Sequence, residues 1–328
     1  MEKLKAVVLY PCDNAQRVMM EETTKDRCEL LFVPPDMSCE ERLPILEQAD
    51  VIFGEPEISE ILQCPKLRWV QMSWAGTDKY TRTEGFPRGR VQLTSAKGCY
   101  SVVIAEYILA VLLELCRNLK QYAENQGRQQ WKKLGTTTLL YGKRALILGA
   151  GDIGTATAGR LRPFEVYVTG MRRTERNYPD CFDRMITLEE LDQELPQADI
   201  VIASLPGTAQ TEGLLDGRRL RLMKEDALLV NVGRGSLIDT DALVKVLEEG
   251  HLGGVALDVV APEPLPEDHP LWKFERVVIT PHVAGQSFGL CKDTENRIIQ
   301  LSCRNLERYL DGKKLENLVD FDTGYSSL

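Results

Sequence analysis

The sequence lacks closely spaced cysteine pairs. Its nine cysteines lie at positions 12, 28, 39, 64, 99, 116, 181, 291 and 303, and no two of them form a C-x-x-C motif. Structural zinc sites use such pairs, and the disulfide frameworks of small secreted domains use an even, dense set of cysteines. The cysteines therefore indicate neither a metal centre nor a disulfide scaffold. They fit the reducing cytoplasm, where we expect this chain to act.

The chain also lacks an excess of positive charge. It has 40 Lys and Arg residues against 49 Asp and Glu residues, which gives a formal net charge of -9. A protein that binds nucleic acid or an anionic membrane needs a basic surface. We therefore expect neither nucleic acid nor a membrane to be its main partner.

Long apolar runs without charge are absent as well. The most apolar stretch, 102–116, contains Glu106 and Glu114, and Arg117 follows it. A membrane-spanning helix needs about 20 consecutive, mainly apolar residues. The stretch therefore predicts a helix that is buried or lies at an interface. Because it is hydrophobic on all sides, we expect it to form part of the twofold interface of a homodimer.

What the sequence does contain is a regular alternation of strand-like apolar runs and helical stretches. The first series of runs is 6–10, 30–33, 51–53, 69–72 and 91–94. The second series is 144–148, 166–169, 200–203, 228–232, 254–259 and 277–280. This alternation is typical of parallel α/β sheets. The final segment, 296–310, has helical spacing and no strand after it, so we expect it to pack on the first series.

A glycine pattern follows the run 144–148 directly. Gly149, Gly151 and Gly154 have the spacing G-x-G-x-x-G and open a helical stretch. The first glycine permits a tight turn, and the third lets the helix pack closely on the strand. The second lets backbone amides near Asp152 and Ile153 approach a pyrophosphate at the helix N-terminus. An ordinary glycine-rich turn is the alternative, but the strand–loop–helix context favours a dinucleotide site.

These patterns predict an α/β fold with two doubly wound, Rossmann-like domains. The substrate domain would be flavodoxin-like and discontinuous, made of residues 1–98 and 289–328, because the last helix returns to it. Residues 99–288 would form the NAD(P)-binding Rossmann domain.

Only three histidines are present, and one stands out. His251 follows what resembles a helix C-terminus, and His269 lies in a proline-rich loop among acidic residues. His282 follows Pro281 at the end of a strand-like run, where α/β proteins bind ligands. A buried structural histidine is the alternative, but the position favours catalysis.

An arginine and two carboxylates precede this histidine. Arg234 stands between two glycines, so a ligand can approach it closely, and its fork can hold the carboxylate of a 2-keto acid. His282 can protonate the ketone oxygen as hydride arrives, and Glu263 beside it would favour the charged imidazole. Asp258 ends a strand-like run and either holds a nicotinamide amide or caps a loop. The set indicates hydride transfer to a keto acid.

Six motifs together resemble the D-isomer-specific 2-hydroxyacid dehydrogenase family over essentially the whole chain. They are Gly-Cys-Tyr-Ser at 98–101 with Ile-Ala-Glu at 104–106, the glycine pattern at 149–154, Ser-Leu-Pro at 204–206 with Thr208 and Thr211, Asn-Val-Gly-Arg-Gly at 231–235, Leu-Asp-Val at 257–259 with Glu-Pro at 263–264, and Pro-Leu-Trp at 270–272 with Thr-Pro-His at 280–282.

The resemblance implies roles for particular residues. It makes Arg234 the substrate anchor, His282 the proton donor and Glu263 its partner. The backbone amides of Ala75 and Gly76 would bind the substrate carboxylate. Further cofactor contacts would come from Leu205, Pro206, Thr211, Val232, Gly233, Asp258 and His282. The related formate dehydrogenases carry glutamine at the position of Glu263, so the glutamate favours 2-keto acids.

The cofactor preference is predicted from a missing acid. NAD-binding sites place Asp or Glu about 20 residues after the first glycine to accept the ribose 2′-hydroxyl. Here residues 168–173 read Val-Thr-Gly-Met-Arg-Arg. Arg172 and Arg173 suit a 2′-phosphate, so NADPH is favoured. NAD remains possible, because the two arginines can also be plain solvated loop residues.

The sequence thus favours an NADPH-preferring reductase of small 2-keto acids such as glyoxylate or hydroxypyruvate, which would yield the D-2-hydroxy acid. One alternative is an NAD-dependent dehydrogenase of a larger D-2-hydroxy acid. Another is a dinucleotide-sensing binding protein, because the C-terminal-binding-protein corepressors resemble the same family. The aromatic residues Trp74, Tyr100, Trp131 and Phe288 are equally candidates for a substrate pocket and for core packing.

Overall fold

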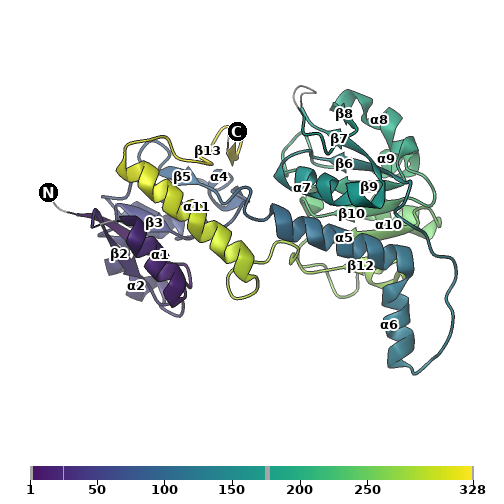
Figure 1. Cartoon of the computed structure of the whole chain (residues 1–328), viewed down its shortest axis with the longest axis horizontal. Helices are drawn as coiled ribbons and strands as arrows, with labels where there is room; N and C mark the ends of the chain where they lie inside the picture. Colours follow the sequence, from purple (N-terminus) through teal and green to yellow (C-terminus); the bar gives the residue numbers. More distant parts are fainter. Residues whose placement is uncertain (1–2, 25, 174–177, 327–328) are drawn as a thin grey trace. The chain divides into compact units, whose positions relative to one another are not determined.

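The computed structural model describes residues 3–24, 26–173 and 178–326. The chain forms two compact units, one made of Met1–Tyr100 with Gln286–Leu328 and the other of Ser101–Gly285. The boundaries expected from the sequence lie at 98/99 and 288/289. The second unit is one continuous segment inserted between the two parts of the first, as the colours of Figure 1 show.

The first unit is built on a parallel five-stranded sheet in the order β2-β1-β3-β4-β5. Its strands are β1 (Leu4–Val8), β2 (Cys28–Phe32), β3 (Val51–Phe53), β4 (Trp69–Gln71) and β5 (Gln92–Thr94). Every residue of β3 and β4 is buried. Strands covered on both faces are expected to be apolar throughout, which is why these runs were visible in the sequence.

Helices flank this sheet. They are α1 (Asn14–Thr24), α2 (Cys39–Leu46), α3 (Ile58–Gln63), α4 (Asp78–Thr81) and α11 (Lys292–Leu310). The returning helix α11 packs beside α1, as Figure 1 shows. A short hairpin of β13 (Val319–Asp320) and β14 (Tyr325–Ser326) follows, and Leu318 bridges to Thr94 of β5. The predicted return of the final helix to the first unit is therefore correct.

The second unit contains a parallel seven-stranded sheet in the order β12-β11-β10-β9-β6-β7-β8. Its strands are β6 (Arg144–Leu148), β7 (Tyr167–Met171), β8 (Arg184–Ile186), β9 (Ile200–Ala203), β10 (Leu228–Asn231), β11 (Gly254–Leu257) and β12 (Val277–Ile279). The strand order reverses between β6 and β9. Doubly wound sheets bind ligands beyond the carboxyl ends of the strands at such a switch point.

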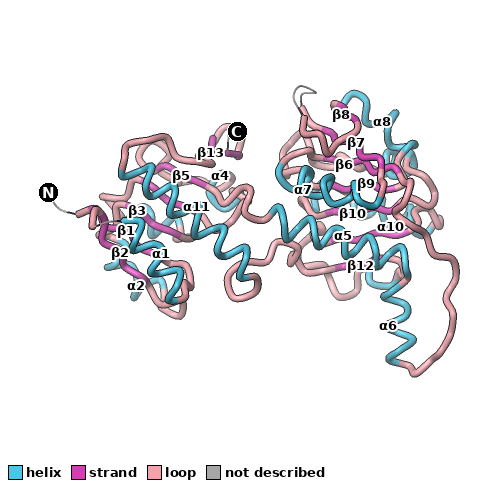
Figure 2. The backbone as a smooth tube through the Cα atoms, in the orientation of Figure 1, coloured by secondary structure: helices cyan, strands magenta, loops and turns pink. Residues whose placement is uncertain are grey.

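The helices of the second unit are α5 (Ser101–Arg117), α6 (Leu119–Gly127), α7 (Asp152–Leu161), α8 (Leu191–Glu194), α9 (Gly217–Leu222) and α10 (Thr240–Glu248). Short 3-10 turns are η1 (Arg162–Phe164), η2 (Leu188–Glu190), η3 (Leu195–Gln197), η4 (Gly235–Leu237) and η5 (Pro270–Lys273). Helix α5 packs on α7, and Figure 2 shows a long loop between α6 and β6. The predicted α/β fold with two doubly wound units is confirmed.

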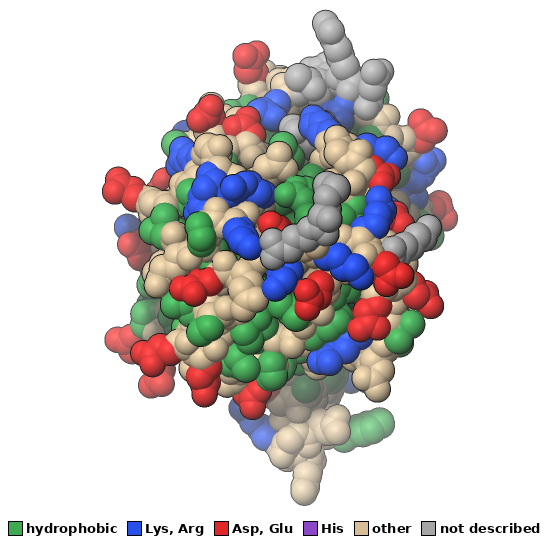
Figure 3. Space-filling view, turned by 90° about the vertical axis from the view of Figure 1, so that its left-hand side faces the viewer, with side chains coloured by type: hydrophobic (Ala, Val, Ile, Leu, Met, Phe, Trp, Pro, Cys, Tyr) green, Lys and Arg blue, Asp and Glu red, His purple; other side chains and the backbone are tan. Residues whose placement is uncertain are grey.

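On the face drawn in Figure 3, acidic and basic side chains are interspersed. Within the part of the chain that the structure describes, no helix is both long and apolar enough to cross a membrane.

Candidate active site

The glycine loop after β6 is shaped by two close backbone approaches. Gly149 has φ +109, and a Cβ there would lie 3.1 Å from the backbone carbon of Ser204. A Cβ on Gly154 would lie 2.2 Å from the carbonyl oxygen of Gly149. Both positions therefore require glycine. A residue with a side chain at 154 would push α7 away from the loop.

Gly151 has the opposite environment. Nothing lies within 4 Å of the position that its Cβ would take, and Gly151 is the N-cap residue of α7. Asp152 and Ile153 form the first turn of this ten-residue helix. The first amides of a helix have no partner within it and attract anions. This open helix N-terminus fits the pyrophosphate of a dinucleotide.

The loop after β9 lies next to the glycine loop and contains three predicted cofactor residues. The Ser204 hydroxyl donates to the carbonyl oxygen of Gly149 over 3.0 Å. Thr211 Oγ1 donates to the carbonyl oxygen of Pro206 over 2.6 Å and accepts from the Thr208 amide over 2.8 Å. Leu205 stands against Gly233, whose Cβ would lie 2.4 Å from the Leu205 carbonyl oxygen.

The end of β7 carries the two arginines. The Arg172 amide donates to Ile186 of β8 over 3.1 Å, which places Arg172 at the carboxyl edge of the sheet. The Arg172 side chain is partly buried and Arg173 is exposed. No carboxylate occurs among residues 168–173, so nothing in this segment would repel a 2′-phosphate.

The backbone around Arg234 is fixed from both sides. A Cβ on Gly235 would lie 1.8 Å from the carbonyl oxygen of Val260. The buried Asn231 accepts from the Gly233 amide over 3.1 Å and donates to the Arg234 carbonyl over 3.0 Å. Val232, also buried, continues from β10 into this turn. The turn therefore holds Arg234 at the carboxyl end of β10.

Glu263 and His282 are brought together by the second unit. His282 Nδ1 lies 3.2 Å from Glu263 Oε2, and the two side chains are 54% and 40% exposed. The other Glu263 oxygen accepts from the Val260 amide over 3.0 Å. Glu263 is thus tied to the backbone while it contacts one ring nitrogen. The second ring nitrogen, Nε2, has no hydrogen-bond partner among the described residues.

His282 stands in a strained backbone position that Asp258 supports. Its φ is +54, and its amide donates to the Asp258 carbonyl over 2.8 Å. The Asp258 carboxylate, whose residue is 3% exposed, accepts from the Val283 amide over 2.8 Å and the Ala284 amide over 2.9 Å. Asp258 therefore holds the chain that directly follows His282.

A hydroxyl chain extends from Asp258 to helix α5. Thr280 Oγ1 donates to Asp258 Oδ1 over 2.6 Å, and the Tyr107 hydroxyl lies 2.6 Å from Thr280 Oγ1. Because Thr280 gives its proton to Asp258, the Tyr107 hydroxyl is the donor to Thr280. Burial raises the pKa of Tyr107 to about 12, so this hydroxyl stays protonated at neutral pH. The sequence analysis did not identify Tyr107. The contact with the cofactor that was expected of Asp258 would come in addition to the hydrogen bonds that its carboxylate accepts from Thr280, Val283 and Ala284.

The residues predicted to bind the substrate carboxylate lie in the first unit. Ala75 is exposed and Gly76 is partly buried, in the loop between β4 and α4. Their amides donate to no protein acceptor among the described residues. Two neighbouring amides in this state suit a carboxylate ligand.

Comparison with known proteins identifies the family. The model for the NAD binding domain of D-isomer specific 2-hydroxyacid dehydrogenases matches residues 109–284. The chain belongs to this family. The matched region contains the glycine loop, Arg234, Glu263 and His282. The protein is therefore an NAD(P)-dependent 2-hydroxyacid dehydrogenase, as the sequence motifs predicted.

Relatives and solved structures agree with this assignment. A glyoxylate reductase of Thermofilum pendens is 34% identical to this dehydrogenase over 78% of the chain and 76% of the relative. A family protein from Aeromonas salmonicida has 30% identity and a TM-score of 0.87, covering 98% of this chain and 100% of its own. An NADPH-dependent glyoxylate/hydroxypyruvate reductase from Sinorhizobium meliloti shares the fold, with 23% identity, a TM-score of 0.81, and coverage of 98% and 100%.

The four candidate pocket aromatics of the dehydrogenase divide into two groups. Tyr100 is buried and donates to the Ser73 carbonyl over 2.8 Å, and Phe288 stacks on Tyr10 at 5.0 Å between ring centroids. Both are packing residues of the first unit. Trp74 is 46% exposed and Trp131 is fully exposed.

Among the described residues no group of three His, Cys, Asp or Glu side chains could hold a metal ion.

Proposed function

We propose that this dehydrogenase reduces a small 2-keto acid, such as glyoxylate or hydroxypyruvate, to the D-2-hydroxy acid, with NADPH as the preferred cofactor. The observation that carries the proposal is the 3.2 Å contact between His282 Nδ1 and a backbone-tied Glu263. An imidazole held in this way presents Nε2 as a proton donor.

The cofactor would be held at the carboxyl edge of the seven-stranded sheet. Gly149, Gly151 and Gly154, with the amides of Asp152 and Ile153, would receive the pyrophosphate. Further contacts would come from Leu205, Pro206, Thr211, Val232, Gly233, Asp258 and His282. When bound, the reduced nicotinamide supplies a hydride to the keto carbon.

Side chains and backbone amides of the protein would bind the substrate carboxylate and supply the proton. The guanidinium of Arg234 binds the carboxylate and the carbonyl oxygen of the substrate, and the amides of Ala75 and Gly76 bind the carboxylate. His282 gives the Nε2 proton to the keto oxygen as negative charge develops there. Glu263 stabilises the charged imidazole before this transfer and keeps the ring oriented.

The NADPH preference rests on Arg172 and Arg173 after β7. A 2′-phosphate needs cationic partners, and a carboxylate at this place would repel it. The S. meliloti reductase, which shares the fold, was solved with NADP. We therefore expect a higher kcat/KM with NADPH than with NADH.

We also propose that the enzyme is a cytoplasmic homodimer. The nine cysteines all lie among the described residues and form no disulfide, as expected in a reducing compartment. Helix α5 leaves the apolar residues Val102, Val103, Leu109 and Leu113 only partly buried within one chain. A second copy of α5 would cover them. Sedimentation at micromolar concentration would show a dimer, and a monomer would refute this part of the proposal.

A substrate panel tests the activity. Turnover of glyoxylate, hydroxypyruvate, pyruvate, phenylpyruvate and 2-ketoisocaproate would be followed with NADPH and with NADH. We expect the highest kcat/KM for glyoxylate or hydroxypyruvate. A preference for a bulky keto acid with NADH would support the dehydrogenase of a larger hydroxy acid. Tight dinucleotide binding without any turnover would support a dinucleotide-sensing protein.

A further inference from the structure

A carboxylate outside the assigned site supports the loop that carries Ala75 and Gly76. Glu55 follows β3 by two residues, and Ser73 follows β4 by two residues, while the parallel register pairs Phe53 with Gln71. The Gly54 amide extends this pairing by donating to the Gln71 carbonyl over 2.9 Å. Because neighbouring parallel strands end at the same edge of a sheet, the register brings Glu55 opposite Ser73.

One oxygen of Glu55 accepts three hydrogen bonds from this loop. Glu55 Oε1 lies 2.6 Å from the Ser73 amide, 2.9 Å from the Ser73 hydroxyl and 3.3 Å from the Trp74 amide. Hydrogen bonds to an ionised carboxylate are roughly twice as strong as neutral ones. Glu55 therefore fixes the backbone immediately before Ala75.

The carbonyl groups of the same two residues are also bound. The Tyr100 hydroxyl donates to the Ser73 carbonyl over 2.8 Å, and the Ala96 amide donates to the Trp74 carbonyl over 2.9 Å. Every backbone polar group of Ser73 and Trp74 thus has a partner in the first unit. The next two amides, of Ala75 and Gly76, have none among the described residues. The loop is anchored up to the point at which its amides become available to a ligand.

We propose that Glu55 is the positioning residue that holds the Ala75 and Gly76 amides ready for the carboxylate of the substrate. The proposal rests on the proposed function, since that function supplies a carboxylate for these amides to bind. Glu55 acts through Ser73 and Trp74. Amides that are already oriented bind an anion without first losing conformational entropy.

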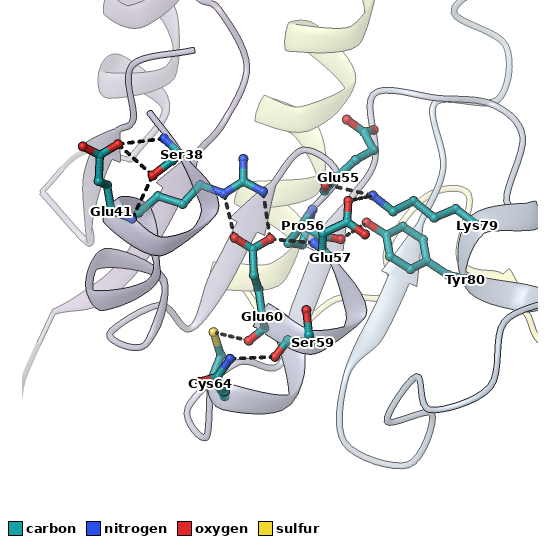
Figure 4. Close-up of polar contacts among 12 residues, drawn as sticks. Ser38, Glu41, Glu55, Pro56, Glu57, Ser59, Glu60, Cys64, Lys79 and Tyr80 are labelled. Atoms are coloured by element: carbon teal, nitrogen blue, oxygen red, sulfur yellow. Dashed lines mark hydrogen bonds and ion pairs between the residues drawn. The ribbon is translucent and has the colours of Figure 1, made fainter. Parts of the chain in front are cut away.

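Lys79 contacts both the backbone of Glu55 and the side-chain carboxylate of Glu57. Figure 4 shows Lys79 between Glu55 and Glu57: its Nζ lies 3.2 Å from the Glu55 carbonyl oxygen and 2.9 Å from Glu57 Oε1. The Tyr80 hydroxyl donates to the Pro56 carbonyl over 2.7 Å. Glu57 therefore shares the cation with Glu55 but makes no hydrogen bond to the loop among the described residues, which makes it a matched control.

The ionisation of Glu55 gives the proposal a pH signature. Burial raises the pKa of the Glu55 carboxyl above its ordinary value, while the donors of Ser73 and Trp74 and the charge of Lys79 oppose this rise. The phenols that face Glu55 stay neutral because burial raises their pKa values as well; they belong to Tyr10, Tyr80 and Tyr100. As the pH falls through this raised pKa, Glu55 becomes neutral and accepts more weakly, so the loop loosens.

The sign of the stability effect separates positioning from a purely structural role. A carboxyl whose pKa is raised in the folded state favours folding at low pH, and this contribution is lost as the pH rises through the raised pKa. Glu55→Gln, which removes the charge but keeps an acceptor oxygen, should therefore leave the thermal midpoint at neutral pH unchanged or higher. A positioning role requires that the same change weakens substrate binding.

The experiment compares Glu55→Gln and Glu55→Ala with the control Glu57→Gln. We expect Glu55→Ala to raise KM for the keto acid about tenfold, a loss of about 1.4 kcal/mol, and Glu55→Gln to raise it less because the amide oxygen still accepts. KM for NADPH should stay the same in all three variants. In the unmodified enzyme KM for the keto acid should rise on acidification, and in Glu55→Gln it should rise less.

Hydrogen exchange without substrate tests the loop independently of turnover. The Trp74 amide should lose protection in Glu55→Ala and keep it in Glu57→Gln. Unchanged protection, or an unchanged KM for the keto acid in a folded Glu55→Ala, would overturn the role of Glu55. If Glu55→Ala fails to fold, Glu55→Gln and the pH dependence of KM decide in its place. If no keto acid is reduced by the unmodified enzyme, the proposed function fails, and exchange still shows whether Glu55 holds the loop.

Discussion

Replacing Thr280 with valine tests the hydrogen-bond chain that supports His282. Valine keeps the shape of threonine but removes the hydroxyl that lies 2.6 Å from Asp258 Oδ1 and 2.6 Å from the Tyr107 hydroxyl. Asp258 keeps the amides of Val283 and Ala284 as donors. The change therefore removes one bond to a buried carboxylate and the acceptor of one tyrosine.

The magnitude follows from these two losses. A hydrogen bond to a charged group contributes about 1.5–3 kcal/mol, and an unpaired hydroxyl that is only partly buried costs about 1 kcal/mol. Thr280→Val should therefore lower the free energy of unfolding by about 2.5–4 kcal/mol. Thr280→Ser keeps the hydroxyl and removes one methyl group, which costs about 1 kcal/mol. We expect kcat/KM to fall about tenfold in the valine variant, because small displacements of catalytic groups are costly.

A double-mutant cycle with Tyr107→Phe provides the assay. The free energy of unfolding would be measured by urea denaturation, in the transition that NADPH stabilises, for both single variants and the double variant. Thr280→Val should cost about 1 kcal/mol less when Tyr107 is already phenylalanine, since no hydroxyl is then left unpaired. Equal costs of Thr280→Val and Thr280→Ser, or additive effects in the cycle, would refute the hydroxyl chain.

Three further predictions concern the proposed chemistry and cofactor. His282→Gln should lower kcat about 100-fold or more while the Kd for NADPH stays nearly unchanged, because the general acid is lost; near-normal turnover would remove His282 from the mechanism. Arg172→Ala or Arg173→Ala should lower kcat/KM with NADPH by a factor equivalent to about 1–3 kcal/mol, as for a charge-assisted contact, and should leave kcat/KM with NADH unchanged. Equal kcat/KM with both cofactors in the unmodified enzyme would contradict this. Gly154→Ala should abolish dinucleotide binding, because its Cβ would lie 2.2 Å from the Gly149 carbonyl oxygen, and a normal Kd in calorimetry would show that the loop adapts.

The sheets could be predicted from the sequence because their strands are continuous apolar runs. The predicted runs 51–53, 144–148 and 200–203 coincide with β3, β6 and β9. Strand β8 (Arg184–Ile186) was missed, since three residues at the sheet edge leave no readable pattern. Helix α11 begins at Lys292, four residues before the predicted start, because its first turn is polar and the apolar spacing begins later.

The candidate site residues could be identified in the sequence, but the residues that hold them in place could not. Arg234, Glu263 and His282 stood out because their chemistry suits hydride transfer to a keto acid. The contact of Tyr107 with Thr280 joins residues 173 positions apart. The pairing of Glu55 with Ser73 depends on the register of two strands. Such contacts follow from three-dimensional packing, which no local spacing encodes.

The insertion of one unit into the other has a consequence for the order of events during synthesis. The second unit is complete once Gly285 has been made, whereas the first, although it begins at the N-terminus, still lacks α11. Until then α1 has no α11 to pack against, and buried Asn305 cannot donate to Gln71 in the five-stranded sheet. On the ribosome the segment translated second can therefore finish folding first, while the earliest segment waits with apolar surface uncovered. Chaperones that recognise such surfaces would encounter the nascent chain mainly through its first hundred residues.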